Sequence, residues 1–354
     1  MTSRHILAAF AAVLAVTAAC GRTASPRLPS PVGVDRHPRL TTVASCDQLE
    51  TAIENSVVLA MKSQVEQLRT GWGGVVYATG GPMPAATPSS SPSGPGTFTT
   101  TNTQVAGVDE ADFVQNDGTR IAALAGGRLH LVSSWPADAL AEAASVAIEG
   151  WPRELFLTGN QVVVFSSVYV PRTLEGDHPV CAGPLMGAAA MPTGLWCGYA
   201  ASDVTKITTV DVTALGAPKV TAEIYLPGRY VAARRIDARV RLVLVDDLPF
   251  PDGVRLWPDV PAGASDAERN RVFDDLEAQD EALIRARTLD DWLRRGKVVQ
   301  PGGTTRELDY ACGDFALSSA PSRPGILTVA TLDLATQALV ARTSVLAQAG
   351  VVYA

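Results

Sequence analysis

Four carboxylates near residue 110 are the residues of this sequence whose type and spacing best suit chemistry. They are Asp109, Glu110, Asp112 and Asp117, and Gly118 follows the last of them. Carboxylate oxygens are ligands that calcium prefers, and a calcium-rich exterior would keep such a site filled. The spacing matches no calcium loop, and the glycine that an EF-hand needs is absent. Two hypotheses follow: a calcium site, or carboxylates that cap turns and accept backbone N–H groups where a β domain begins.

Cysteines are the second set of residues with chemical potential. The chain has five cysteines, and Cys20 is a candidate for acylation, as described below. The other four are an even set, which suits an oxidising compartment and can pair in three ways. They are Cys46, Cys181, Cys197 and Cys312. We favour Cys181 with Cys197, because bridging the Gly/Ala/Pro/Met loop between them would offset about 3 kcal/mol of chain entropy. Cys46 with Cys312 is then the remaining pair. Free thiols and the other pairings are the alternatives, and the absence of a Cys-x-x-Cys spacing argues against a zinc or thioredoxin-like site.

The first residues have the pattern of a signal peptide, which we place at residues 1–19. Arg4 and His5 precede a short apolar run at 6–16, which is too short to span a bilayer as a helix. Small residues directly before Cys20 resemble the cleavage site of bacterial lipoproteins, which would leave Cys20 as an acylated first residue. Ordinary secretion, with Cys20 incidental, is the alternative. We expect a protein on the extracytoplasmic face of a bacterial membrane, held there by its N-terminal lipid only, or a secreted protein.

The composition excludes several classes of partner. The chain has 354 residues, long enough for a sizeable core, and a formal net charge of −7. No basic stripe is present, which argues against nucleic acid and against an anionic membrane surface as partners.

Catalytic motifs are missing from the sequence. The four histidines are scattered, and only His130 falls in a predicted strand, where alternation with Leu129 and Leu131 turns it to the opposite face. No Gly-x-Ser-x-Gly elbow, His-Glu-x-x-His motif or P-loop occurs. We interpret the tryptophans as packing residues. Enzymatic activity therefore stays open, and a non-enzymatic role is favoured.

The elements that must position these residues begin with a tether, predicted over 20–44, and a helix, predicted over 45–70. Ser45 and Gln48 have the spacing of a capping box. Apolar residues at helical spacing predict a face that docks on the main domain, and a coiled-coil seam is the less favoured alternative; this face is Leu49, Ile53, Val57, Ala60, Met61 and Leu68. A Pro/Gly/Ser-rich linker follows over 78–100, and its composition predicts disorder.

Alternating apolar residues then predict a series of short strands. Gly126-Gly127 and Gly159-Asn160 each separate two such runs and predict hairpins. A helical insertion is predicted over 265–295. Ser265 and Glu268 begin it with a capping box, Thr288 and Asp291 restart it, and Gly296 is expected just past its end. Its buried face should contain Val272, Leu276 and Leu283, and its alternating charges predict a solvated opposite face.

Several motifs in the predicted strand region resemble a family of secreted and lipid-anchored bacterial proteins that carry a β-propeller domain distantly related to WD-type repeats. The motifs are 101–112 (Thr-Asn-Thr-Gln-Val-Ala-Gly-Val-Asp-Glu-Ala-Asp), Asn116-Asp117-Gly118, Trp151-Pro152-Arg153-Glu154-Leu155, Val210-Asp211-Val212, Leu226-Pro227-Gly228 and Leu289-Asp290-Asp291-Trp292-Leu293. The resemblance covers residue 46 to the end. It implies a fold and a compartment, and it assigns no biochemical role.

We therefore predict a mainly β protein with an incomplete β-propeller of antiparallel strands over 101–354. About eleven strands make fewer than three four-stranded blades, and the family's members run on further, so we expect a truncated propeller. The leading functional hypothesis is a lipid-anchored binding or scaffold protein whose partner is a protein or an envelope polymer. The alternatives are a metal-dependent propeller enzyme acting on envelope polymer or peptide, and a truncated product without function.

Overall fold

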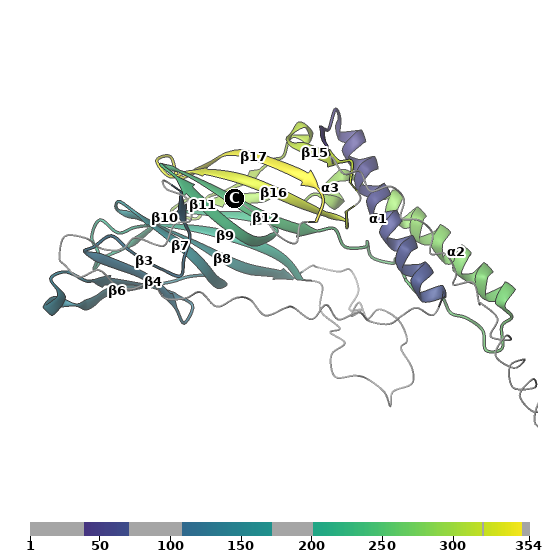
Figure 1. Cartoon of the computed structure of the whole chain (residues 1–354), viewed down its shortest axis with the longest axis horizontal. Coiled ribbons are helices and arrows are strands. Elements are labelled where there is room, and N and C mark those ends of the chain that lie inside the picture. Colours follow the sequence, from purple (N-terminus) through teal and green to yellow (C-terminus); the bar gives the residue numbers. More distant parts are fainter. Residues whose placement is uncertain (1–38, 71–107, 172–200, 321, 349–354) are drawn as a thin grey trace, which may run out of the picture. The chain divides into compact units, whose positions relative to one another are not determined.

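The structure, a computed structural model, describes residues 39–70, 108–171, 201–320 and 322–348 (Figure 1). The predicted signal peptide, Cys20, Cys181, Cys197 and the linker at 78–100 lie outside these residues. Within the described residues the strands form three sheets, and each sheet contains a four-stranded antiparallel meander. The strands of the meander follow one another directly in the first two sheets, whereas other strands lie between the second and third strands of the third meander. None of the helices in the described ranges is both long and apolar enough to cross a membrane.

The first sheet is a single meander in the order β3-β4-β5-β6. Its strands are β3 (Val114–Asn116), β4 (Arg120–Ala125), β5 (Arg128–Ser133) and β6 (Ala141–Ala147), with the short helix η1 (Ala137–Ala139) before β6. Gly126 and Gly127 form the predicted turn between β4 and β5 with φ of 54° and 75°, angles that glycine adopts without steric cost. His130 faces away from the buried Leu129 and Leu131, as the alternation predicts.

The second sheet has the order β14-β13-β10-β9-β8-β7. Its meander consists of β7 (Trp151–Thr158), β8 (Gln161–Pro171), β9 (Ala201–Asp211) and β10 (Lys219–Pro227), and the hairpin β13 (Gly296–Val299) and β14 (Thr305–Leu308) extends it. The predicted turn at Gly159-Asn160 joins β7 to β8.

The third sheet has the order β1-β15-β17-β16-β12-β11-β2. Its meander consists of β11 (Arg229–Ile236), β12 (Arg239–Asp247), β16 (Gly325–Asp333) and β17 (Ala338–Leu346). The remaining strands are β2 (Asp109–Glu110), β15 (Phe315–Ser318), which is parallel to β17 and follows the short helix η2 (Cys312–Asp314), and β1 (Leu40–Thr42). The predicted tether therefore ends before residue 40, because Leu40–Thr42 pairs with β15.

These sheets correct the predicted number of repeating units. The sequence pattern indicated fewer than three four-stranded units, and the described residues contain three. Two strands of the first meander account for the difference. β3 has only three residues and β6 is rich in alanine, so neither has a clear apolar alternation.

The second sheet is buried on both faces. Val162 and Val164 of β8 belong to an apolar cluster with the first sheet, whereas Val163 and Phe165 belong to a cluster with the third sheet. Because side chains alternate along a strand, a strand with covered faces on both sides reads as a continuous apolar run. The run Val162–Phe165 fits this expectation.

A third apolar cluster holds the helices together. Helix α1 (Cys46–Arg69) buries six residues, Leu49, Ile53, Val57, Val58, Met61 and Val65, whereas Ala60 and Leu68 are only half-buried. Ser45 caps α1 by accepting a hydrogen bond from the Gln48 N–H. The capping box is incomplete, because Gln48 Oε1 accepts from the N–H of Ala44 at 2.7 Å.

Helix α2 (Asp266–Arg285) begins with the predicted capping box of Ser265 and Glu268, but its buried face differs from the prediction. The buried residues are Phe273, Leu276, Asp280 and Ile284, while Val272 is half-buried and Leu283 is exposed. The prediction missed this face because its third member is a carboxylate, Asp280, which accepts a hydrogen bond from the Arg255 N–H at 3.1 Å.

Two further expectations were wrong, one of them in this region and one for tryptophans elsewhere in the chain. Helix α3 (Leu289–Trp292) has its predicted Thr288–Asp291 capping box, but Gly296 begins β13 instead of following a helix end. A Cβ on Gly296 would lie 2.6 Å from the backbone oxygen of Tyr225, so close strand pairing requires glycine there. Trp135 and Trp151 are 54% and 64% exposed, so these two are not packing residues.

Candidate functional site

The segment that carries the predicted acidic residues lies where the three meanders meet. β2 pairs with β11, the first strand of the third meander, and places Asp109 opposite Arg235 and Glu110 opposite Arg234. Asp112 then forms a bridge with Leu155 of β7, the first strand of the second meander. The same segment continues directly into β3, the first strand of the first meander. We call residues 109–115 together with Glu154, Tyr230, Arg234 and Arg235 the junction.

Two of the predicted carboxylates form ion pairs with β11. The Arg235 Nε and Nη2 donate to Asp109 Oδ2 at 3.0 and 2.8 Å, and Arg234 Nη2 lies 3.3 Å from Glu110 Oε1. All four side chains are 20 to 29% exposed, so their attraction is less screened than that of a fully exposed pair. These contacts attach the entering segment to the third sheet.

Glu154, which is half-buried, and Tyr230, which is buried, add a polar pair that the sequence analysis missed. The Tyr230 hydroxyl donates to Glu154 Oε2, and its ring stacks on Phe165 with the centroids 5.2 Å apart. Burial raises the pKa of Glu154, and the nearby Asp112 and Glu110 charges add to this effect, while the Tyr230 hydrogen bond and Arg234 oppose it. Burial and the Glu154 charge also raise the pKa of Tyr230. Glu154 lies in a motif of the family resemblance, but no local signal indicated that Tyr230 would face it.

Gln115 connects the junction to the second sheet through its side chain. Its Nε2 donates to the Glu110 backbone oxygen at 2.9 Å, and its Oε1 accepts from the Leu157 N–H at 2.7 Å. The side chain is buried, so both hydrogen bonds replace contacts with water. Gln115 therefore links the entering segment to β7.

Asp117 lies apart from the other three carboxylates and organises a turn. Its Oδ1 accepts from the N–H of Thr119 and of Arg120 at 3.0 and 2.7 Å. Burial alone would raise the pKa of Asp117, but the hydrogen bonds from Thr119 and Arg120 lower it below its usual value. The guanidinium of Arg120 also donates to the Gly159 backbone oxygen at 2.6 Å, which joins this turn to the β7–β8 turn.

The structure does not gather the four carboxylates as a metal site would require. Asp109 and Glu110 face arginines, Asp117 accepts from a turn, and Asp112 Oδ1 accepts from the Phe113 N–H at 2.7 Å. Within the described residues, no group of three His, Cys, Asp or Glu side chains is placed to hold a metal ion. Asp112 and Asp117 accept backbone N–H groups, as the turn-capping hypothesis expects, whereas Asp109 and Glu110 pair with arginines of β11, which it did not include.

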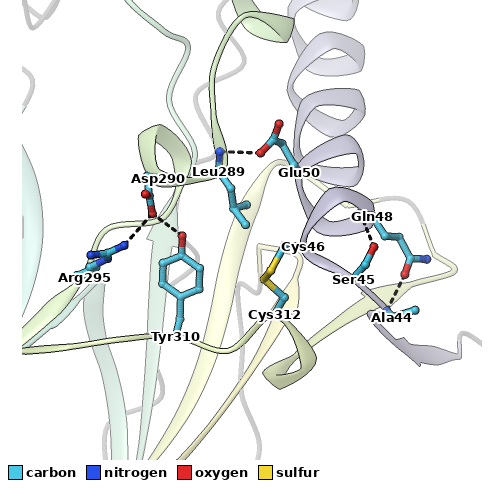
Figure 2. The surroundings of a disulfide bond; sticks show 10 residues. All are labelled: Ala44, Ser45, Cys46, Gln48, Glu50, Leu289, Asp290, Arg295, Tyr310 and Cys312. Atoms are coloured by element: carbon cyan, nitrogen blue, oxygen red, sulfur yellow. Dashed lines mark hydrogen bonds and ion pairs between the residues drawn. A yellow bond between two sulfur atoms is a disulfide. The ribbon is translucent and has the colours of Figure 1, made fainter.

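A disulfide joins Cys46 and Cys312, the remaining pair of the sequence analysis, with their Cα atoms 5.2 Å apart (Figure 2). It ties the first residue of α1 to η2, just before β15. Figure 2 also shows Glu50 of α1 accepting from the Leu289 N–H at 2.8 Å. The disulfide holds α1 against η2, and the hydrogen bond holds it against the start of α3.

Ion pairs extend this attachment along α1 and α2. Arg69 lies 2.8 Å from both Asp274 and Glu277, and Lys62 lies 2.6 Å from Glu281. The alternating charges predicted a face of the insertion that contacts only solvent. This prediction holds only in part, because some of these charges pair with α1.

Comparison with known proteins identifies the class of the chain. A family model described as a β-propeller domain matches residues 98–354, and the chain belongs to this family. The junction lies inside the matched region, and α1 lies before it. No curated protein and no solved structure matches the chain.

Proposed function

We propose that this chain is a non-catalytic binding or scaffold protein on the extracytoplasmic face of a bacterial membrane, held there by a lipid on Cys20. Its partner is a protein or an envelope polymer. The observation that carries the proposal is the junction, where one segment pairs with β11 and β7 and continues into β3, and so joins the first strands of three meanders. Such a frame holds the loops between strands in fixed positions, which suits recognition.

The electrostatics of the junction favour a structural and binding role over catalysis. A catalytic carboxylate is directed at a substrate, whereas Glu154 accepts from Tyr230, and Asp109 and Glu110 pair with arginines. Networks of this kind also perturb pKa values, so the raised pKa of Glu154 does not by itself indicate an active site. The Cys46–Cys312 disulfide supports an oxidising compartment.

The location is tested with the full chain and a Cys20→Ser variant expressed in a bacterial host. The wild-type chain should incorporate a labelled fatty acid and sediment with membranes, whereas the variant should do neither. Cys46→Ser is the matched control, because it removes a cysteine and leaves the acylation site intact. A wild-type chain that stays soluble and unlabelled would refute the lipid anchor and leave the binding role to the next test.

The binding role is tested with the soluble Cys20→Ser chain and purified cell-wall sacculi. We expect the protein to sediment with the sacculi, or to cross-link to a specific membrane protein in cells, without releasing soluble fragments from the sacculi. Fragment release that depends on added calcium or another divalent cation would overturn the proposal in favour of a metal-dependent enzyme. The absence of both sedimentation and a specific cross-link would refute binding.

A further inference from the structure

A proline-rich segment of the insertion, residues 249–264, lies along helix α2, and we call it the strap. It contains neither helix nor strand. Three pairs of neighbouring residues align it with the helix: Gly253 with Leu283, Arg255 with Asp280, and Trp257 with Phe273. Positions that rise along the strap meet positions that fall along α2, so the two segments run antiparallel.

The strap has few backbone hydrogen bonds to hold it in place. Its internal ones close two tight turns, from the Val254 N–H to the Pro251 oxygen at 3.2 Å and from the Ala264 N–H to the Pro261 oxygen at 3.1 Å. Its prolines have no N–H to donate. In the described part of the chain, the bond from the Arg255 N–H to Asp280 Oδ1, 3.1 Å long, is therefore the main polar attachment of the strap to α2.

Asp280 is an unusual residue for this attachment, because its side chain is removed from water. The residue is 1% exposed and lies on the apolar face of α2 between Leu276 and Ile284. Its Oδ1 accepts the Arg255 N–H, whereas its Oδ2 has no hydrogen-bond partner among the described residues. A buried carboxylate ion with one unpaired oxygen is costly, and a neutral carboxyl group costs less in the same place.

The charged groups on the elements around Asp280 largely satisfy one another. They come from the strap, from α1 and from α2 itself, and they are Arg255, Asp259, Lys62, Arg69, Asp274, Glu277 and Glu281. The cations of α1 pair with the other carboxylates of α2 at 2.6 to 2.8 Å. The Arg255 guanidinium is exposed and lies 3.6 Å from Asp259. Burial raises the pKa of Asp280, and the N–H and the charge of Arg255 oppose this effect only in part.

We propose that Asp280 is a pH-sensitive catch, which holds the strap on α2 while its carboxyl group is protonated and releases the strap when the group ionises. The protonated group still accepts the Arg255 N–H through its carbonyl oxygen and buries no charge. The ionised group gains water as a partner for Oδ2 when the strap lifts away. Because the closed form raises the pKa of Asp280, it is favoured at low pH and loses this advantage as the pH rises through the raised pKa. The catch is separate from the proposed binding role and does not depend on it.

The test is hydrogen exchange with peptide mass mapping, on the full chain carrying Cys20→Ser, between about pH 4 and about pH 8. After correction for the intrinsic exchange rate, the protection of the strap amides should fall severalfold as the pH rises. In Asp280→Asn the side-chain oxygen can still accept from the Arg255 N–H but cannot ionise, so the protection of the strap should stay constant. The β4–β5 hairpin in the same samples is the internal reference for changes in global stability.

Asp275→Asn is the matched control, because it makes the same substitution at an exposed position of α2, and it should keep the pH dependence of the wild type. A purely structural role for Asp280 would make Asp280→Asn change the protection of the strap by the same factor at every pH, and that result would overturn the proposal. A wild-type strap whose protection stays constant, or falls no more than that of the β4–β5 hairpin, would overturn it as well. This last comparison needs no variant, so it decides the question even if Asp280→Asn does not fold.

Discussion

The first and third sheets contain the same four-stranded meander, yet they are completed in different ways. The first sheet consists of four strands that follow one another through short connections. The third sheet has a long insertion at 248–324 between β12 and β16, and it also recruits β1 and β2 from earlier in the chain. The comparison shows that one supersecondary unit can depend on local turns in one place and on distant segments in another.

This difference has an energetic consequence. Closing a longer loop costs more chain entropy, although the cost rises only slowly with length. Contacts between segments far apart in sequence offset this cost: β1 pairs with β15, and beside the sheet a disulfide joins α1 to η2, 266 positions apart. We therefore expect the third sheet and the helices to respond to perturbations that leave the first sheet intact.

The largest expected effect comes from removing the disulfide in a Cys46→Ser/Cys312→Ser double variant. A bond that closes so long a loop should contribute about 3–5 kcal/mol to the free energy of unfolding. Urea denaturation followed by circular dichroism measures the loss. Hydrogen exchange should increase in α1 and β15 and stay unchanged in β4 and β5. Equal increases in both regions would show that the first and third sheets unfold as one unit.

Gly296→Ala should have the next largest effect, because it pushes β13 away from β10. The new Cβ would lie 2.6 Å from the Tyr225 backbone oxygen and 3.3 Å from a Leu308 methyl group. Overpacking of this kind costs about 1–3 kcal/mol. The matched control is Gly313→Ala, whose Cβ would meet no atom within 4 Å. Thermal unfolding of both variants checks the prediction, and an equal change in midpoint would contradict it.

A smaller effect concerns pH and the junction. Burial holds the pKa of Glu154 above 4.5 in the folded state, so its stabilising contribution is complete below that pH and is lost as the pH rises through the raised pKa. Glu154→Gln should therefore gain stability relative to the wild type between acidic and neutral pH. Tyr230→Phe should show the opposite trend, because it removes a donor to the ionised carboxylate. Urea titrations across this range measure both slopes, and identical slopes in all three proteins would refute the coupling.

The smallest expected effect is that of calcium. The carboxylates at 109, 110, 112 and 117 already face arginines or backbone donors. Adding calcium or a chelator should therefore leave the unfolding midpoint unchanged within error. A rise with calcium that Asp112→Asn abolishes would restore the metal hypothesis.

The hairpins and helix caps could be predicted from the sequence, whereas the junction could be predicted only in part. The Gly126-Gly127 and Gly159-Asn160 turns and the capping boxes at Ser265 and Thr288 are present where the pattern indicated them. The acidic residues were recognised as a candidate site only by their clustering, and their arginine partners on β11 were not foreseen. Pairing between residues more than a hundred positions apart leaves no local signal.

Turns, caps and strand alternation were determined by the sequence itself, because each depends on the backbone preferences of neighbouring residues. Only the tertiary structure decided that Tyr230 meets Glu154, that Asp280 takes a place on the buried face of α2, and that Gly296 begins a strand. Each of these outcomes depends on which element packs opposite, and the free energy of that packing is set by the whole fold.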